Sequence, residues 1–212
     1  MSTTTGGGEA PDRDPIRIVD LTGRKIRIVG LAGLKRSGKD TLAHEMMRMD
    51  GYMRMAMADA LRAEIWAEQG VPPMPDSMKD LPLPGREDGS TYRDLMRHRG
   101  GARRLEHPEY WVRKVELAVR MIDTLAATHG LPWPCYVIPD VRMDNEIEWI
   151  RSMGGVIVWV RRPGITSDGH VTEGDLSEHA DFIVVNDGSV EALHGSTMKN
   201  LAALADGLAQ GS

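Results

Sequence analysis

The sequence predicts a three-layer α/β/α fold in which helices cover both faces of a parallel sheet. In the last third of the chain, short apolar segments alternate with segments of helical spacing, which is the pattern of βαβ units. Nearer the start, a glycine-rich loop lies between an expected strand and an expected helix. The composition, 41% hydrophobic and 27% charged over 212 residues, is ordinary for a single globular domain.

Charge and cysteine content exclude several classes of protein. With 31 acidic and 26 basic residues the formal net charge is -5, so no overall basic field attracts a nucleic-acid polymer. The single cysteine, Cys135, cannot form an internal disulfide, which favours a reducing compartment. No apolar run approaches the roughly 20 residues of a membrane span, and the polar first residues lack a signal-peptide core. We therefore expect a soluble cytoplasmic protein without membrane or nucleic-acid partners.

The first part of the chain contains an expected tail and two pairs of a strand and a helix. Residues 1–15 have too few apolar side chains to pack, so a disordered tail is expected before one domain over residues 16–212. Runs of β-branched residues predict strands, and apolar residues at helical spacing predict helices. The expected strands are 26–33 and 52–56, and the expected helices are 41–49 and 60–69.

The middle of the chain is expected to be a loop followed by two helices. Residues 71–89 are rich in proline and acidic residues, which predicts an exposed irregular segment. A helix over 90–99 should begin with Ser90 or Thr91 as its N-cap. A longer helix over 108–128 carries an apolar stripe that predicts a face packed on the core. The stripe consists of Trp111, Val115, Ala118, Ile122 and Leu125.

The last third alternates strands with helices, and this alternation predicts parallel strands. An irregular stretch that ends at Ala180 interrupts it. The expected strands are 135–141, 154–162 and 181–187, and the expected helices are 144–153 and 189–209.

Residues 33–39 form the pattern G-x-x-x-x-G-K between the first expected strand and the next helix. This context predicts a P-loop NTPase fold, because the glycines let backbone N–H groups converge on phosphate oxygens and the helix N-terminus adds positive charge. The lysine of the loop would reach the β- and γ-phosphates of ATP. The alternative is a glycine-rich turn that binds no ligand. The residues expected to bind ATP here are Gly33, Lys35, Arg36, Ser37, Gly38 and Lys39.

The residue after the loop lysine departs from the common pattern. A Ser or Thr usually follows the lysine and ligates Mg²⁺, whereas here Asp40 follows it and Thr41 comes one place late. Either Asp40 takes part in metal binding, directly or through water, or Thr41 does so through a shifted geometry. Both residues are therefore candidates for ATP and magnesium binding.

Several motifs occur in a defined order along the chain. They are GLKRSGKDT, TYRDLMRHRGGARRLEHPEYW, VIPDVRMDNEIEWIRSMGGVIVWVRRPG, HVTE and DFIVVNDGSVEAL. Together they resemble the deoxynucleoside monophosphate kinases of tailed bacteriophages, over about residues 26–195. The second motif is similar to a helix, a glycine-containing turn, an arginine and a tryptophan of that family, although residues 101–103 lack the acidic residue that often follows the turn.

The resemblance implies a kinase that moves the γ-phosphoryl group of ATP, with Mg²⁺, to a deoxynucleoside monophosphate. It also implies a helical acceptor-binding insertion over about residues 71–130 and a short lid over about residues 161–180. The partners would be these two small molecules, with a second copy of the chain as a candidate homodimer partner. For a phage-encoded protein the compartment would be the host cytoplasm.

The expected catalytic residues are Lys39, Asp140 and Arg142. The last two follow an expected strand, and ligands of open α/β sheets bind at the carboxyl ends of strands. Asp140 would organise the metal or the acceptor, and Arg142 would neutralise developing charge. Alternatively, Asp140 caps the following helix. Arg161 and Arg162 end the next strand, where the resemblance implies lid arginines over ATP and the alternative is a solvated strand end.

Candidate acceptor-binding residues lie in the insertion and in two later motifs. Arginine binds phosphate bidentately, and tryptophan can stack on a base. The sequence leaves open which of Arg103 and Arg104 contacts substrate, and Trp111 fits the core better than a stacking role. The resemblance adds residues of the N-E pair and of the H-x-[ST]-E motif. The full set is Arg93, Arg103, Arg104, Trp111, Asn145, Glu146, His170 and Glu173, and Thr172 completes the H-x-[ST]-E motif.

Two other classes of function share the donor half of this pattern. One is a P-loop kinase of another phosphorylated small molecule, of the phosphomevalonate or dephospho-coenzyme A type. The other is a nucleotide-binding switch or ATPase, which would be favoured by a guanine-specifying N-K-x-D string that the sequence lacks. A catalytically inactive α/β domain is disfavoured because the loop lysine and the strand-end aspartate are both present.

Overall fold

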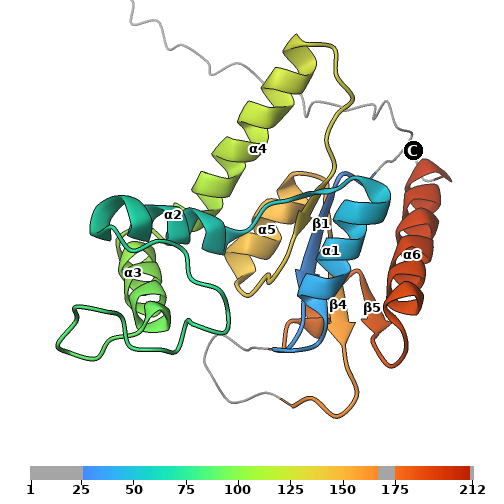
Figure 1. Ribbon diagram of the computed structural model, residues 1–212. Coiled ribbons are helices and arrows are strands. Elements are labelled where there is room, and N and C mark those ends of the chain that lie inside the picture. Colours follow the sequence, from blue (N-terminus) through green and yellow to red (C-terminus); the bar gives the residue numbers. More distant parts are fainter. Residues whose placement is uncertain (1–25, 167–174, 211–212) are drawn as a thin grey trace, which may run out of the picture.

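A five-stranded parallel sheet forms the centre of the molecule, in the order β2-β3-β1-β4-β5 (Figure 1). The computed structural model describes residues 26–166 and 175–210. The expected tail over residues 1–15 lies outside the described residues. The strands are β1 (Ile28–Ala32), β2 (Met53–Arg54), β3 (Tyr136–Ile138), β4 (Val156–Arg161) and β5 (Phe182–Val185).

Helices cover both faces of this sheet. One face packs against α1 and α6, and the other packs against α2, α4 and α5, with α3 resting on α2 and α4 (Figure 1). A single 3₁₀ turn, Ser177–His179, precedes β5. The helices are α1 (Lys39–Asp50), α2 (Met57–Gln69), α3 (Tyr92–Glu106), α4 (Tyr110–Thr128), α5 (Asp144–Ser152) and α6 (Val190–Gln210).

The central strands are buried on both faces, which explains their continuous apolar sequences. In β1 all five residues are buried. Ile28 packs into the core under α4 and α5, whereas its neighbour Val29 and then Leu31 pack into the core under α1 and α6. The alternation follows from the two-residue period of a strand. The predicted three-layer α/β/α fold with a parallel sheet is therefore confirmed.

Every expected strand and helix is present, but α3 is longer than predicted. Its N-cap is Thr91, whose hydroxyl accepts from the backbone N–H of Asp94 while the Asp94 carboxylate accepts from the N–H of Thr91. The helix then continues through Gly100 and Gly101 to Glu106, where the resemblance placed a turn. Ion pairs across to α2 hold this last part, because Arg103 Nε lies 2.7 Å from a carboxylate oxygen of Glu64.

The segment between α2 and α3 has no helix or strand longer than an isolated bridge between Pro82 and Thr91. This confirms the irregular segment expected from its prolines. Most of its side chains are exposed, but Leu83 is buried in the core beside Tyr92. Leu83, with the partly buried Val71 and Met74, thus anchors a largely exposed loop to the core.

The apolar stripe of α4 is only partly a core face. Trp111 and Val115 are buried as predicted, and Ile122 is half-buried against the same core. Leu125 is 55% exposed, so its assignment to the core is wrong. The helix extends beyond the sheet at its C-terminal end (Figure 1), and the face that turns inward there is that of Val119 and Ala126.

A buried arginine ties α4 to the start of β1. Arg27 Nη2 lies 2.7 Å from Oδ1 of Asp123, and its Nε donates to the carbonyl of Pro134 at 3.0 Å. The hydroxyl of Tyr136 donates to the same Asp123 oxygen at 2.8 Å. The guanidinium also lies over the ring of Trp133, 4.9 Å from its centroid. The side chains of Arg27 and Asp123 are almost buried, so each charge needs the other to compensate for its loss of hydration.

Among the described residues, none of the helices combines the length and apolar character needed to cross a bilayer.

We expect Arg27→Leu to lower the free energy of unfolding by about 3 kcal/mol, because it leaves the Asp123 carboxylate buried without its cation. Urea denaturation measures this change. The matched control is Arg120→Leu, which removes an exposed i,i+4 pair with Glu116 and should cost about 0.5 kcal/mol or less. Equal effects of the two substitutions would contradict this role of Arg27.

Candidate active site

The carboxyl ends of four neighbouring strands bring the candidate residues to one edge of the sheet. β1 leads into the glycine-rich loop, β3 into Asp140, β4 into Arg162 and β5 into Asn186. Parallel strands place these ends side by side, and open α/β sheets bind ligands at this edge. The structure therefore assembles the predicted donor-binding residues from distant parts of the sequence.

The conformation of the glycine-rich loop depends on its two glycines. Gly33 and Gly38 have φ angles of 141° and 106°, in the region that side chains rarely adopt. A Cβ at Gly33 would collide with the carbonyl oxygen of Val160 in β4. Helix α1 starts directly after Gly38, at Lys39, so its N-terminus with its partial positive charge points into the loop. These are the features by which a P-loop binds phosphate.

Lys39 lies beneath this loop and is only 6% exposed. Its Nζ donates to the carbonyl oxygens of Gly33 at 2.7 Å and Leu34 at 2.9 Å. The same Nζ lies 3.7 Å from Oδ1 of Asp140. The ammonium group is therefore positioned between the glycine-rich loop and the end of β3.

Asp140 lies between two cations at the end of β3. Besides Lys39, it accepts a hydrogen bond at Oδ2 from Nε of Arg142 at 2.8 Å. Its φ of 64° is unusual for a residue with a side chain, and the next residue, Val141, donates its N–H to Leu31 at 2.9 Å. Helix α5 begins four residues later with Met143 at its N-cap. The alternative reading of Asp140 as the cap of α5 is therefore wrong.

Glu146 holds the turn that carries Asp140 and Arg142. Its Oε2 accepts the backbone N–H of Arg142 at 2.8 Å and that of Met143 at 3.3 Å. The side chain is 4% exposed, and this burial raises the pKa of its carboxyl above the usual value. Glu146 thus contacts the protein backbone, which differs from the direct substrate contact that the resemblance implied.

The two adjacent arginines of α3 have different surroundings. Arg103 pairs with Glu64 at 2.7 Å and Glu106 at 3.1 Å, and its guanidinium lies over the ring of Tyr110 at 4.9 Å from the centroid. Arg104 is 37% exposed, and its Nη2 lies 3.9 Å from Oε1 of Glu146. Arg104 is therefore the member of the pair that faces the edge of the sheet.

Three further predicted acceptor residues make contacts within the protein. Arg93 forms a two-pronged pair with Asp80, at 2.5 and 3.1 Å. The indole of Trp111 is 2% exposed, and its Nε1 donates to the carbonyl of Gly100 at 3.2 Å. Trp111 is thus a core residue in this conformation, and a stacking role is not supported. Asn145 donates to the carbonyl of Pro108 at 3.0 Å, so it links α5 to the start of α4.

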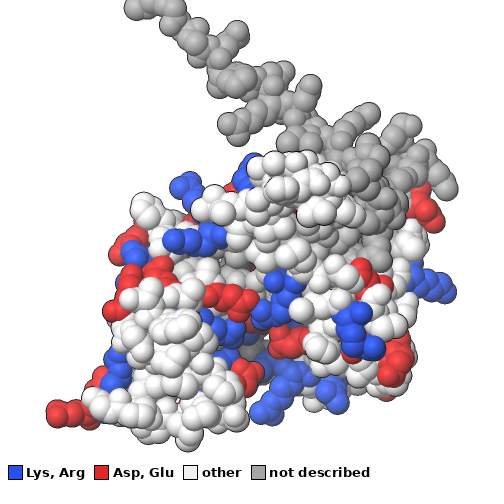
Figure 2. Space-filling view, turned by 45° about the horizontal axis from the view of Figure 1, so that its top comes forward, with Lys and Arg blue, Asp and Glu red and all other residues white. Residues whose placement is uncertain are grey.

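The loop before α3 contains Asp80, the carboxylate that pairs with Arg93. The pKa of Asp80 is held below its usual range chiefly by the hydrogen bond from Arg93, with a smaller electrostatic contribution from Lys35. Lys35 belongs to the P-loop, whereas Asp80 and Arg93 belong to the loop before α3 and to α3 itself. Figure 2 shows Lys and Arg side chains around a hollow between these two parts of the molecule.

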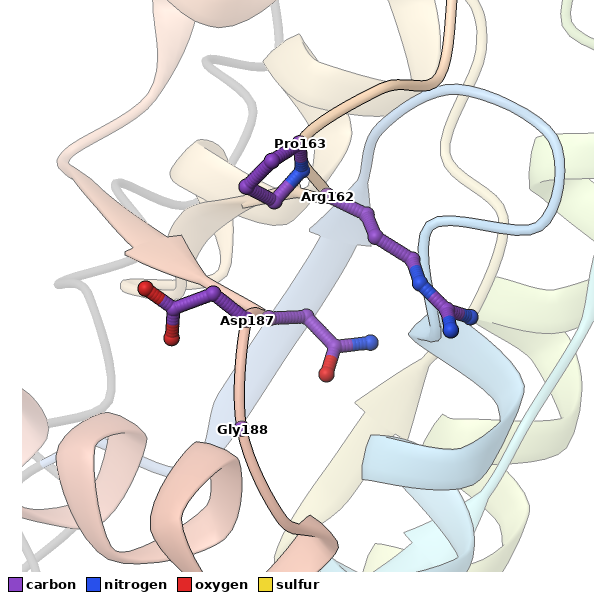
Figure 3. Close-up of a pocket in the computed structure, with 5 residues that line it drawn as sticks. Arg162, Pro163, Asp187 and Gly188 are labelled. Atoms are coloured by element: carbon purple, nitrogen blue, oxygen red, sulfur yellow. The ribbon is translucent and has the colours of Figure 1, made fainter.

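A pocket of about 290 Å³ opens beside the P-loop (Figure 3). The side chain of Arg162 extends from it toward the P-loop and the start of α1, while Asp187 and Gly188 line the opposite side (Figure 3). Arg161 is exposed, and its backbone carbonyl accepts the N–H of Asn186 at 2.7 Å. The predicted residues His170, Thr172 and Glu173 lie outside the described residues. The lining residues are Arg162, Pro163, Asn186, Asp187 and Gly188.

The sequence analysis missed two features of the site. Asn186 donates its side-chain Nδ2 to the carbonyl of Ser37 in the P-loop at 2.8 Å. Asp59, in the first turn of α2, pairs with Arg54 at the end of β2 at 2.5 Å and with Arg62 at 2.7 Å. The first could have been suspected from the N-D-G string at a strand end, and the second from the position of Arg54 at the end of another strand.

Asp40 and Thr41, the two candidate metal-binding residues, are exposed on the first turn of α1. Within residues 26–166 and 175–210, no three His, Cys, Asp or Glu side chains form a group suited to hold a metal ion. A carboxylate that lies beside the P-loop lysine is that of Asp140.

The strand order and the loop define a class of protein. A parallel sheet in which β1 lies between β3 and β4 and leads through a G-x-x-x-x-G-K loop into α1 is the P-loop kinase arrangement of the NTPase fold. A family model described as deoxynucleotide monophosphate kinase matches residues 91–196, half of the chain. The chain belongs to this family.

Two viral proteins of this description match the chain. The deoxynucleotide monophosphate kinase of Enterobacteria phage T4 is 39% identical over 97 residues, which cover 45% of this chain and 38% of the phage protein. The chain therefore matches well under half the length of this relative. A protein of Acanthamoeba polyphaga mimivirus, provisionally described by the same name, is 27% identical over 190 residues. The match covers 79% of this chain and 92% of the mimivirus protein.

Among solved structures, a dephospho-CoA kinase from Campylobacter jejuni superposes with a TM-score of 0.47 at 12% identity. The match covers 85% of this chain and 98% of that chain.

We expect Glu146→Gln to change how stability depends on pH. The folded-state pKa of Glu146 is raised, so the folded protein binds its proton more tightly than the unfolded chain does. Folding stability contributed by this group is thus present below about pH 4.5 and is lost as pH rises toward the raised pKa. Glutamine can still accept the two backbone N–H bonds but does not titrate.

Urea unfolding at several pH values from about 4.5 upward tests this expectation. The wild-type protein should lose stability relative to Glu146→Gln as pH rises, whereas Glu148→Gln, on the exposed face of α5, should follow the wild type. A constant difference between Glu146→Gln and wild type over this range would contradict it.

Proposed function

We propose that the protein transfers the γ-phosphoryl group of ATP to a deoxynucleoside monophosphate and releases ADP and the deoxynucleoside diphosphate. The observation that carries this proposal is the joining of Lys39, Asp140 and Arg142 at the mouth of the P-loop, with Arg104 across from them. Family membership supports the choice of acceptor. A P-loop alone would support only nucleotide binding.

The donor half of the proposal uses the P-loop and the adjoining pocket. Backbone N–H groups of the loop, the N-terminus of α1 and Lys39 would bind the phosphates. The pocket lined by Pro163 and Gly188 has the size for the nucleoside of ATP. Arg162 extends from it toward the P-loop (Figure 3), where it would contact the phosphates. We assign the ends of β4 and β5 to donor binding, and the stretch over about residues 161–180 to the lid.

The residues at the P-loop fit a magnesium ion. Mg²⁺ prefers oxygen ligands and commonly keeps several waters, taking one or two carboxylates and the substrate phosphates as its other ligands. Asp140 offers a carboxylate that is 41% exposed beside Lys39, and Asp40 and Thr41 add exposed oxygen atoms on α1. These residues would hold the ion, which when bound would neutralise charge on the β- and γ-phosphates.

The acceptor half lies on the side of α2, α3 and the loop between them. Arg104 is placed to bind the phosphate of the acceptor, because it is part-exposed and its contact with Glu146 is long, at 3.9 Å. Arg93 would contribute after exchanging its contact with Asp80. This part of the chain corresponds to the proposed insertion over about residues 71–130.

Phosphoryl transfer requires little covalent help from the protein. An oxygen of the acceptor phosphate forms a bond to the γ-phosphorus of ATP, and the bond from that phosphorus to the bridging oxygen breaks as ADP leaves. Two anionic groups must approach in line, so the site must neutralise their repulsion and orient them. Lys39 and Arg142 beside Asp140, and Arg104 beside Glu146, would supply the cations.

The remaining parts of the prediction are proposals of the same kind. The substrates would be two small molecules, and no described feature calls for a polymer or a membrane. A homodimer and a location in the host cytoplasm stay predictions.

An acceptor panel separates the proposed activity from its rivals. ADP release from ATP and Mg²⁺ would be measured with each of the four deoxynucleoside monophosphates, AMP, phosphomevalonate, dephospho-coenzyme A and no acceptor. Release that requires a deoxynucleotide supports the proposal. Release with phosphomevalonate or dephospho-coenzyme A alone would identify another small-molecule kinase, and release without any acceptor would identify an ATPase.

Substitution Lys39→Ala should lower kcat/KM for phosphoryl transfer by at least about 100-fold, because it removes the cation that contacts the transferred group. The coupled ADP assay measures it. The control Lys199→Ala changes an exposed lysine of α6 and should have wild-type activity. Undiminished transfer by Lys39→Ala would refute the assignment of the loop.

Substitution of Arg104 should weaken acceptor binding, whereas substitution of Arg103 should lower stability. We expect Arg104→Met to raise the KM for the acceptor by about tenfold or more, since a charge-assisted hydrogen bond to phosphate is lost, while the KM for ATP stays unchanged. Arg103→Met should instead lower stability, because Glu64 loses one of its cations. Steady-state kinetics and urea unfolding of both variants test this, and the reversed pattern would contradict it.

A further inference from the structure

The P-loop is in contact with a side chain that arrives from the far end of the sequence. Nδ2 of Asn186, at the end of β5, donates to the carbonyl oxygen of Ser37 at 2.8 Å, across 149 positions of the chain. The backbone of Asn186 is itself fixed, since its N–H donates to the carbonyl of Arg161 at 2.7 Å. A side chain on a rigid strand end thus holds one peptide of the loop.

That peptide joins Ser37 to Gly38, and the steric cost of rotating a peptide is low beside a glycine. Glycine tolerates both signs of φ, so a peptide unit beside it can turn over with little steric cost. The position where Gly38 would carry a Cβ is occupied by the carboxamide nitrogen of Asn186. The side chain of Asn186 therefore packs directly against the backbone of Gly38. Any side chain at position 38 would prevent the contact between Asn186 and the loop.

The direction of the Ser37 carbonyl decides what the loop presents to phosphate. In a trans peptide the carbonyl oxygen and the N–H of the next residue point in opposite directions, and the described peptides are all trans. A Ser37 carbonyl held toward Asn186 therefore aims the N–H of Gly38 away from Asn186, into the loop. A turned-over peptide would place a carbonyl oxygen there, which repels a phosphate oxygen.

We propose that Asn186 is a positioning residue that locks the Ser37–Gly38 peptide in the orientation that binds the donor phosphates. The same side chain lines the 290 Å³ pocket beside the loop, so the residue belongs to the pocket and to the phosphate loop at once. Only the kinetic test of this role, the measurement of KM, rests on the proposed function. Phosphate binding by the loop can be measured without any turnover.

Two substitutions at this position test the inference. Asn186→Ala removes the donor without adding charge, and Asn186→Asp keeps the shape but presents only acceptors to the Ser37 carbonyl at neutral pH. The matched control is Asn200→Asp, which makes the same chemical change at a residue of α6 whose Nδ2 donates to the carbonyl of Ser196 at 2.9 Å. Urea unfolding of each variant shows whether the fold is retained.

Binding of inorganic tripolyphosphate, measured by calorimetry, is the deciding readout because it reports on the loop alone. Both Asn186 variants should bind tripolyphosphate about tenfold more weakly than wild type, the loss expected when one oriented hydrogen-bond donor is removed. The KM for ATP should rise by a similar factor, and the KM for the acceptor should stay within about twofold. Asn200→Asp should match wild type in all three.

Unchanged tripolyphosphate binding in Asn186→Ala would overturn the inference, even if the affinity for adenosine falls, because Asn186 would then act by touching the nucleoside. Failure of the wild-type protein to bind tripolyphosphate would overturn it as well. A wild-type protein that binds tripolyphosphate but turns over no deoxynucleotide would refute the proposed function alone. An active wild type with normal Asn186 variants would refute the positioning role alone.

Discussion

The close approach of the P-loop backbone to the ends of β4 and β5 is the constraint on which the site depends. Gly33 lies against the carbonyl of Val160, and Gly38 lies against the side chain of Asn186, so neither position has room for a Cβ. Because the loop is held in this way, α1 begins at Lys39 with its N-terminus in the loop. As a result, the ammonium group of Lys39 lies beneath the carbonyl groups of the loop and beside Asp140. A bulkier loop would move all of these groups together.

A chain of alternating charges joins this loop to the helical part of the molecule. Lys39 contacts Asp140, Asp140 contacts Arg142, the backbone of Arg142 is held by Glu146, and Glu146 faces Arg104 of α3. Each member is thus oriented by its neighbours before any ligand arrives. Preorganised charge of this kind suits a reaction in which two anionic phosphates must be brought together, since little reorganisation is needed at the moment of transfer.

Most of the fold could be predicted because its signals are local. The apolar runs of β1, β3 and β4 are buried on both faces, so consecutive residues along each strand are apolar. The end of α3 could not be predicted, because contacts to Glu64 on α2 override the two glycines of the helix. The exposure of Leu125 was missed for a related reason: periodicity gives the apolar face of α4, but only packing shows how far the sheet extends beneath it.

By itself the sequence determined the parallel α/β architecture, the P-loop with Lys39 at the start of the following helix, and the positions of Asp140 and Arg142 after a strand. Strand periodicity and glycine spacing are properties of neighbouring residues, which is why they could be found without the structure. Only the tertiary structure decided that Arg104 and not Arg103 faces the site, that Glu146 is buried against a backbone turn, and that Asn186 reaches the P-loop. These outcomes depend on which groups, far apart in the sequence, come into contact at the edge of the sheet. Such contacts are set by packing and charge in the folded protein, so no local sequence pattern predicts them.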